Sequence, residues 1–142
     1  MKYVVPFCLL IVLPLCIGCN GNIPVKGKVT FSDDQSPLTD GMVCFETDAF
    51  QARGQLQKDG TYRLGSLKEA DGVPPGTYRV FIMGAVVEDP TAKGLNAPPL
   101  PLITEKFETG SNSGITVEIN AKTRKFDFSV DRHPGTAQKL KK

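Results

Sequence analysis

The chain has 142 residues, 17 basic and 15 acidic side chains, a formal net charge of +2 and four cysteines. This length is that of one ordinary domain, large enough for a hydrophobic core without disulfides. The near balance of charge excludes the strongly basic character on which nucleic-acid-binding domains depend.

The first eighteen residues have the pattern of an export signal. Lys2 supplies a positive charge, and residues 4–17, "VVPFCLLIVLPLCI", carry none. This run is shorter than the roughly 20 residues of a membrane-spanning helix. Pro6 and Pro14 would also interrupt helical hydrogen bonding. A charged start, a short apolar run and small residues after it are typical of a signal peptide. We therefore expect that this segment is not part of the folded domain.

The end of this segment, "CIGC" at residues 16–19, resembles the lipobox of bacterial lipoproteins. Gly18 is the small residue directly before Cys19. In that family the thiol of this cysteine receives a diacylglyceryl group before signal peptidase II cuts. The resemblance implies a signal peptide at 1–18, lipidation of Cys19, with palmitate as an acyl chain, and a tether over 19–23. Cys16 departs from the pattern, which prefers leucine, although it is also small and apolar.

Acylation would hold the mature protein on the cell envelope. Each buried methylene contributes roughly 0.8 kcal/mol, and stable anchoring needs more than one chain, which a diacylated Cys19 supplies. Some bacteria retain lipoproteins at the inner membrane with an aspartate after the cysteine, so Asn20 favours the outer membrane. We therefore expect an exported protein that is lipid-anchored at the outer membrane or periplasmic face. Ordinary secretion by signal peptidase I, with Cys19 left free, is the alternative.

Removal of the signal and acylation of Cys19 leave Cys44 as the remaining free cysteine of the mature chain. A disulfide inside the mature domain is therefore excluded. Cys44 lies in the strand-like run "MVCFE" and is expected to be a small, half-buried apolar side chain. No cationic neighbour in the sequence would lower its pKa and make it a nucleophile.

From Pro24 onward the apolar residues recur with a period of two, which indicates strands with one solvated face. The expected strands cover residues 25–31, 42–47, 52–57, 61–64, 74–84, 115–119 and 126–130. A short edge strand is expected at 104–108. "KDG" at 58–60 predicts a tight hairpin, and "NAKT" at 120–123 predicts a second hairpin loop. No segment of ten or more residues carries a helical stripe with caps.

Seven or eight short strands separated by glycine, proline and aspartate turns predict an all-β fold: a single antiparallel β-sandwich over 24–130, transthyretin-like or immunoglobulin-like. Residues 84–103, rich in proline, form the longest irregular stretch and the best candidate for a variable contact surface. Residues 131–142 lose the alternation and are expected to be a basic flexible tail. The alternation predicts a core made of Val25, Val29, Phe31, Val43, Phe45, Leu56, Tyr62, Leu64, Tyr78, Val80, Ile82, Ile115, Val117, Ile119, Phe126, Phe128 and Val130.

The order of three motifs resembles the carboxypeptidase regulatory-like group of transthyretin-type sandwiches. The motifs are "PVKGKV" at 24–29, "DGTYRL" at 59–64 and "PPGTYRV" at 74–80. The resemblance covers roughly 24–130 and implies a binding or structural role with no catalytic residues to transfer. It assigns Gly60 and Gly76 to turns and Tyr62 and Tyr78 to the core.

The sequence contains no nucleophile elbow, P-loop or dinucleotide fingerprint. His133 is the single histidine, so an ordinary zinc constellation is lacking, and we expect its side chain to be solvated. The acidic pairs at 33–34 and 88–89 do not have the spacing of a calcium loop, and solvated turns explain both. Lys26 and Lys28 are expected to point outward, away from any buried isopeptide crosslink.

These observations predict a non-enzymatic envelope lipoprotein without cofactor or metal, whose sandwich has a structural or protein-interaction role. Its expected partners are membrane lipid, through Cys19, and an envelope protein or polysaccharide, but not nucleic acid. The alternative is a carbohydrate-binding module that uses Phe50 or Phe107 as an exposed aromatic platform. A hydrolase with scattered carboxylates would need a concave acidic pocket. The basic tail is interpreted as a solubilising end, with contact to anionic headgroups as its alternative.

Overall fold

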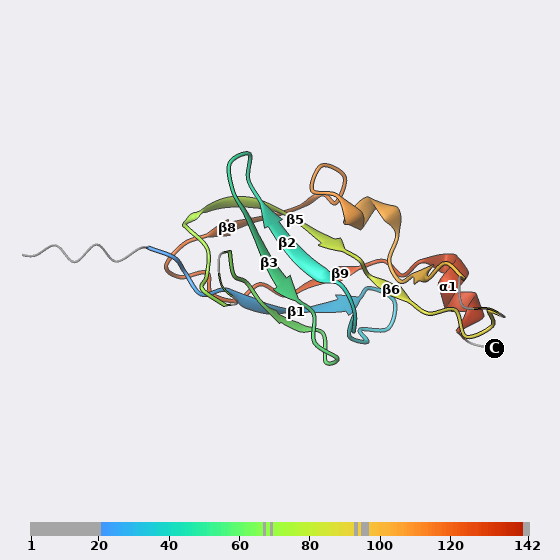
Figure 1. Ribbon diagram of the computed structural model, residues 1–142. Coiled ribbons are helices and arrows are strands. Elements are labelled where there is room, and N and C mark those ends of the chain that lie inside the picture. Colours follow the sequence, from blue (N-terminus) through green and yellow to red (C-terminus); the bar gives the residue numbers. More distant parts are fainter. Residues whose placement is uncertain (1–20, 67, 69, 93, 95–96, 141–142) are drawn as a thin grey trace, which may run out of the picture.

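The computed structural model describes residues 21–66, 68, 70–92, 94 and 97–140. It contains two packed layers of β-sheet, which confirms the predicted all-β sandwich (Figure 1). Cys19 and the rest of the predicted signal segment lie outside the described residues. One sheet has the strand order β4-β1-β9 and the other has the order β3-β2-β5-β8.

The seven main predicted strands are all present. In chain order the elements are β1 Lys26–Phe31, β2 Met42–Glu46, β3 Gln51–Gln55, β4 Thr61–Arg63, β5 Gly76–Met83, β6 Val86–Val87, β7 Leu100–Pro101, the 3₁₀ helix η1 Glu105–Glu108, β8 Ile115–Ile119, β9 Phe128–Val130 and α1 Pro134–Lys139.

Every predicted core residue is buried or packs against the core, with Ile115, Phe126 and Phe128 only partly buried. The agreement follows from the period of two, which sends alternate side chains of each strand to the inner face. Loop residues that no alternation marks complete the core, among them Leu38 and Ile103, both fully buried.

The predicted hairpin at 120–123 is wrong, because the chain changes sheets there. β8 pairs with β5 in the four-stranded sheet, whereas β9 pairs with β1 in the other sheet, with Val29 opposite Phe128. After the crossing, the chain arrives at the end where β1 begins and runs alongside it in the same direction. The β1–β9 pair is therefore parallel, whereas the other sheet pairs are antiparallel.

A hydrogen bond crosses β1 through the space left by a glycine. The Tyr62 hydroxyl donates to the Phe126 carbonyl oxygen at 2.6 Å. Gly27 lies opposite Tyr62 in the β1–β4 pair, and a Cβ on it would stand only 1.9 Å from that oxygen. The close approach therefore requires glycine at this position.

The predicted edge strand at 104–108 is also wrong. These residues form η1, in which the Phe107 amide donates to the Thr104 carbonyl three residues back. Phe107 is the single apolar side chain of this stretch, and one helical turn is enough to bury it. η1 and the turn after it lie on the outer side of β5, where Gly110 approaches the Phe81 ring. Part of this outer face, predicted to be solvated, is therefore covered, whereas Met83 farther along β5 remains exposed.

Parts of the predicted loop and tail are ordered against each other. Within 84–103, β6 and β7 pair as a short antiparallel ribbon. The tail forms the helix α1, and the hydroxyl of Thr136, which is 2% exposed, donates to the Pro101 carbonyl at 2.5 Å. The loss of alternation after Val130 thus marks a packed helix, which differs from the expected flexible tail.

We expect Gly27→Ala to lower the free energy of unfolding by about 3 kcal/mol, because the new methyl group has no space beside the Phe126 carbonyl. Chemical denaturation measures the loss. Gly21→Ala is the matched control, since a Cβ there meets no atom within 4 Å; its stability should change by less than about 0.5 kcal/mol. Equal stability of the two variants would contradict this account of Gly27.

Candidate functional site

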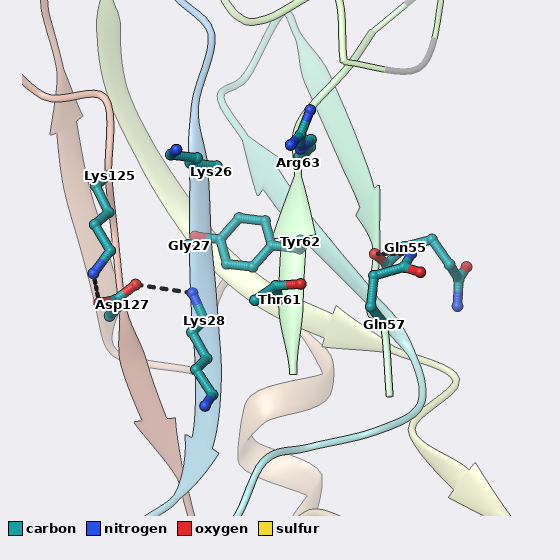
Figure 2. Close-up of a pocket in the computed structure, with 10 residues that line it drawn as sticks. All are labelled: Lys26, Gly27, Lys28, Gln55, Gln57, Thr61, Tyr62, Arg63, Lys125 and Asp127. Atoms are coloured by element: carbon teal, nitrogen blue, oxygen red, sulfur yellow. Dashed lines mark hydrogen bonds and ion pairs between the residues drawn. The ribbon is translucent and has the colours of Figure 1, made fainter. Parts of the chain in front are cut away.

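A groove of about 650 Å³ runs along the outer face of the three-stranded sheet (Figure 2). We call it the basic groove. β1 contributes Lys26 and Lys28, which are exposed as alternation predicted. The groove is lined by Lys26, Gly27, Lys28, Gln55, Gln57, Thr61, Tyr62, Arg63, Lys125 and Asp127. Four of these side chains are cationic and one is anionic, so this hollow is not the acidic pocket that a hydrolase would need.

Strand register places three cations side by side across the groove. Lys26 is paired with Arg63 of β4 on one side and bridged to Lys125 on the other. Like charges directly opposite each other destabilise a sheet. Asp127 offsets part of this charge, because its carboxylate lies 2.6 Å from the Lys125 ammonium. Within the described residues, Lys26 and Arg63 form no ion pair.

The same carboxylate also fixes the backbone of β1. The Lys28 amide donates to Asp127 Oδ1 at 2.9 Å, while Oδ2 faces Lys125, as the dashed lines in Figure 2 show. Asp127 is therefore bound on both oxygens by its own sheet. The Lys28 side chain extends along the groove without an ion-pair partner in the described part of the chain.

The acidic pair at 33–34 is part of an ion-pair cluster at the far end of β1. Arg132 Nε lies 3.0 Å from Asp33, and its Nη2 lies 3.0 Å from Asp34. The guanidinium also stacks on the Phe31 ring at 3.6 Å. Hydrogen bonds from the Ser36 hydroxyl and amide, with the charge of Arg132, lower the pKa of Asp34 to about 2. The two carboxylates thus hold the start of the tail.

The second acidic pair has a similar structural role. Asp89, whose side chain is 11% exposed, accepts a hydrogen bond from Lys139 of α1 at 2.9 Å. This bond, followed by those from the hydroxyl and amide of Thr91, lowers the pKa of Asp89 to about 2. A basic residue of the predicted tail therefore ties α1 to the loop that contains β6 and β7.

Cys44 is fully buried rather than half-buried, because its side of β2 lies within the covered outer face of the four-stranded sheet. It stands opposite Phe81 of β5, which η1 and the following turn help to cover. Burial raises the pKa of the Cys44 thiol to about 11, against a smaller opposing effect of the Arg53 charge. A neutral thiol of this kind is not a nucleophile at neutral pH.

The aromatic platforms predicted for carbohydrate binding are not displayed. Phe107 is 6% exposed, and the Lys106 ammonium lies 4.5 Å from its ring centroid. Phe50 is half-buried and packs edge-on against Tyr78. The predicted role of Phe107 is therefore wrong, since its ring belongs to the core. His133 is half-buried at the start of α1 rather than solvated.

Metal ligands and membrane-spanning helices can be assessed for the described residues alone. No group of three histidine, cysteine, aspartate or glutamate side chains among them is placed to hold a metal ion. None of the helices in the described ranges has both the length and the apolar character needed to cross a bilayer.

No family model and no curated protein matches the chain. Two solved structures are similar to it. The major pilin subunit of Bacillus cereus, BcpA with the D312A change, matches at 11% identity and a TM-score of 0.44, over 79% of this chain and 30% of the pilin. A 9R-lipoxygenase from Cyanothece matches at 16% identity and a TM-score of 0.36, over 77% of this chain and 16% of the enzyme. The chain thus spans less than a third of either protein, and TM-scores this low carry no inference about its role.

The basic groove is the feature that sequence reasoning missed. Alternation correctly placed Lys26 and Lys28 on an outer face, and "TYR" at 61–63 gave Arg63 the same outward direction. The sequence contains no signal that β9 lies parallel to β1, and this pairing is what brings Lys125 beside Lys26.

We expect the free energy of unfolding to decrease in acid as the carboxylates of Asp34 and Asp89 become protonated. Asp34 and Asp89 have pKa values near 2 in the fold, below their ordinary value of 3.8. Because the folded pKa is lowered, their contribution is present above about pH 4 and is lost as pH falls toward 2. Asp34→Asn with Asp89→Asn should flatten this fall, measured as unfolding free energy against pH. Glu118→Gln, at an exposed position of β8, is the control; the same profile for all three proteins would contradict the assignment.

We expect Cys44 to resist alkylation while the protein is folded. A rise of the thiol pKa from 9.0 to about 11 leaves roughly 100-fold less thiolate near pH 8, and burial slows access further. The measurement is the mass increase with iodoacetamide in a chain that starts at Gly21, where Cys44 is the single cysteine. Denaturant should restore rapid labelling. Similar rates in the folded and unfolded chain would show that the thiol is accessible.

Proposed function

We propose that this protein is an exported lipoprotein, held in the cell envelope through an acylated Cys19, whose β-sandwich has a structural or protein-binding role. The observation that carries the proposal is the lipobox-like "CIGC" followed almost at once by the folded domain. Ile23 is already bound to Val73 by backbone hydrogen bonds of 2.7 and 3.0 Å. Four residues extend at most about 14 Å, so the tether would keep the sandwich close to the lipid surface.

The arrangement of the elements supports a particular orientation. The chain enters the sandwich at one end of its long axis, and β6, β7 and α1 lie at the opposite end (Figure 1). An anchor at Cys19 would therefore present that opposite end to partners. Among the described residues, the exposed large apolar side chains belong to the end of β5, β6 and the end of α1, and they are Met83, Val86 and Leu140. Exposed apolar side chains at the end farthest from the anchor favour a protein partner there.

A non-catalytic role is supported by the structural interactions of the thiol and carboxylate side chains that could otherwise take part in catalysis. The Cys44 thiol is buried with a raised pKa. Asp33 and Asp34 bind Arg132, and Asp89 binds Lys139. These groups hold segments of the fold together, so we propose an interaction domain and not an enzyme.

We propose that the domain is of the carboxypeptidase regulatory-like type, with the order of the three motifs as the basis. Tyr62 and Tyr78 are 1% and 2% exposed, as the resemblance implies. Gly60 has a φ of +79° in the hairpin between β3 and β4, which supports its assignment to a tight turn. Gly76 begins β5 and is not among the residues with positive φ, so its turn role receives no such support.

We expect protein purified from its native membrane to begin at Cys19 and to have a mass increased by acyl chains. Cys19→Ser should abolish the added mass and release the protein from the membrane fraction, as intact mass and fractionation measure. Cys44→Ser is the matched control. Because Cys44 lies inside the fold, this substitution should leave acylation of Cys19 unchanged. An unmodified Cys19 in the native protein would refute the anchor and leave ordinary secretion.

A further inference from the structure

We propose that the basic groove binds an acidic polysaccharide, a chain of sugars that carry carboxylates. This inference does not depend on acylation of Cys19. It rests on an excess of positive charge, on the spacing of the cations and on the polar side chains at one side of the groove.

Positive charge gathers on this face in excess of what the fold neutralises. Besides the four cations of the groove, Arg124 lines a second hollow of about 310 Å³ that shares Lys26 and Arg63 with the groove. The carboxylates that face these cations are Asp127, bound to Lys125, and Asp59, which lies near Lys28. Five cations therefore meet two carboxylates, which leaves charge for an anionic ligand to neutralise.

Repulsion between the cations in this row destabilises the sheet, and an anionic ligand would reduce that repulsion. Lys26 lies directly opposite Arg63 and beside Lys125, a placement that destabilises a sheet when no anion is near. Neighbouring strands are ~4.8 Å apart, so the charges repeat across the groove at a spacing comparable with one pyranose ring. Carboxylates on the side of a polymer that faces the sheet can thus approach this row of cations.

The rest of the lining fits sugar hydroxyls. Gln55 donates its side-chain amide to the Gly41 carbonyl, and Gln57 donates to the Gln55 carbonyl. One N–H of each side-chain amide is engaged inside the protein, so each glutamine keeps its side-chain oxygen as an acceptor and a second N–H as a donor for sugar hydroxyls. Figure 2 shows the two glutamines on the opposite side of the groove from Lys125 and Asp127.

The groove is less suited to the other polyanions. Tyr62 is the aromatic residue of the lining, and at 1% exposure its ring is not available to stack on bases, as single-stranded nucleic acid requires. Gly27 alternates with Lys26 and Lys28 and faces the inner layer, so only its backbone lines the groove between these two cations. A concave face receives a polymer chain better than it receives a planar bilayer.

The test measures binding of polygalacturonate to the full protein as the cell produces it, kept in a neutral detergent. Uncharged dextran, glycerol phosphate as the soluble headgroup of phosphatidylglycerol, and single-stranded DNA are compared in the same assay. We expect polygalacturonate to bind at low salt and to weaken as salt rises, since the contacts are solvent-exposed ion pairs. Lys26→Gln with Arg63→Gln should weaken its Kd at least tenfold. Arg53→Gln with Lys122→Gln removes the same charge outside the groove and should change the Kd less than twofold.

A thermal readout separates loss of the site from loss of the fold. Without ligand, the Lys26→Gln, Arg63→Gln protein should have a Tm at or above that of the wild type, because a repulsion has been removed. Polygalacturonate should raise the Tm of the wild type and of the Arg53→Gln, Lys122→Gln control, and should raise the Tm of the Lys26→Gln, Arg63→Gln protein less. If that variant does not fold, Lys28→Gln with Arg124→Gln removes the two other cations without ion-pair partners and should show the same tenfold loss.

Three results would overturn the proposal. They are the absence of polygalacturonate binding, an equal loss in the groove and control variants, and stronger binding to glycerol phosphate or to DNA than to polygalacturonate. Intact mass of the same sample reports acylation of Cys19 separately, so failure of the anchor and failure of the groove are distinguishable.

Discussion

The three-stranded sheet depends on one hydrogen bond that passes through the space beside Gly27. Tyr62 on β4 and Phe126, where the chain approaches β9, lie on opposite sides of β1, and the 2.6 Å bond between them joins both neighbours of that strand. Burial raises the pKa of Tyr62, so its hydroxyl keeps the proton that it donates. If the hydroxyl were missing, a largely buried carbonyl would lose a partner, at a cost of about 1–3 kcal/mol. Backbone hydrogen bonds from the Lys26 amide to the Arg124 carbonyl and from the Phe126 amide to the Lys26 carbonyl hold Lys125 beside Lys26. This close approach leaves no space for a side chain at Gly27, so the basic groove depends on glycine there.

The two sheets differ in what covers their outer faces, and this difference determines which side chains are available for chemistry. η1 and the turn after it cover part of the outer face of the four-stranded sheet, where Cys44 and Phe81 are buried. The outer face of the three-stranded sheet has no such cover in the described structure. The thiol is therefore withdrawn from solvent with a raised pKa, whereas Lys26 and its neighbours remain exposed.

The two ends of the sandwich have separate roles in the proposed function. At one end Ile23 joins the fold directly after the tether, which leaves little freedom between the domain and an acylated Cys19. At the other end, Arg132 and Lys139 bind the carboxylates of preceding loops and hold the C-terminal segment on the sandwich. Within the described residues, the basic side chains of the predicted tail, Arg132 and Lys139, are therefore engaged in the fold. The groove lies along the side between these ends, so a polymer bound there and a protein bound at the far end would not compete.

The sequence by itself determined the strands, the inner side chains and the outward direction of Lys26 and Lys28. This was possible because alternation is a local property: each strand sends successive side chains to opposite faces whatever it pairs with. Tertiary structure alone decided which outer face is covered, that residues 120–123 cross between sheets, and that Phe107 belongs to the core. These outcomes depend on contacts between segments far apart in the chain, such as β1 with β9, and no local pattern records them. The row of cations in the groove is the clearest case, because two of its members meet only through that distant pairing.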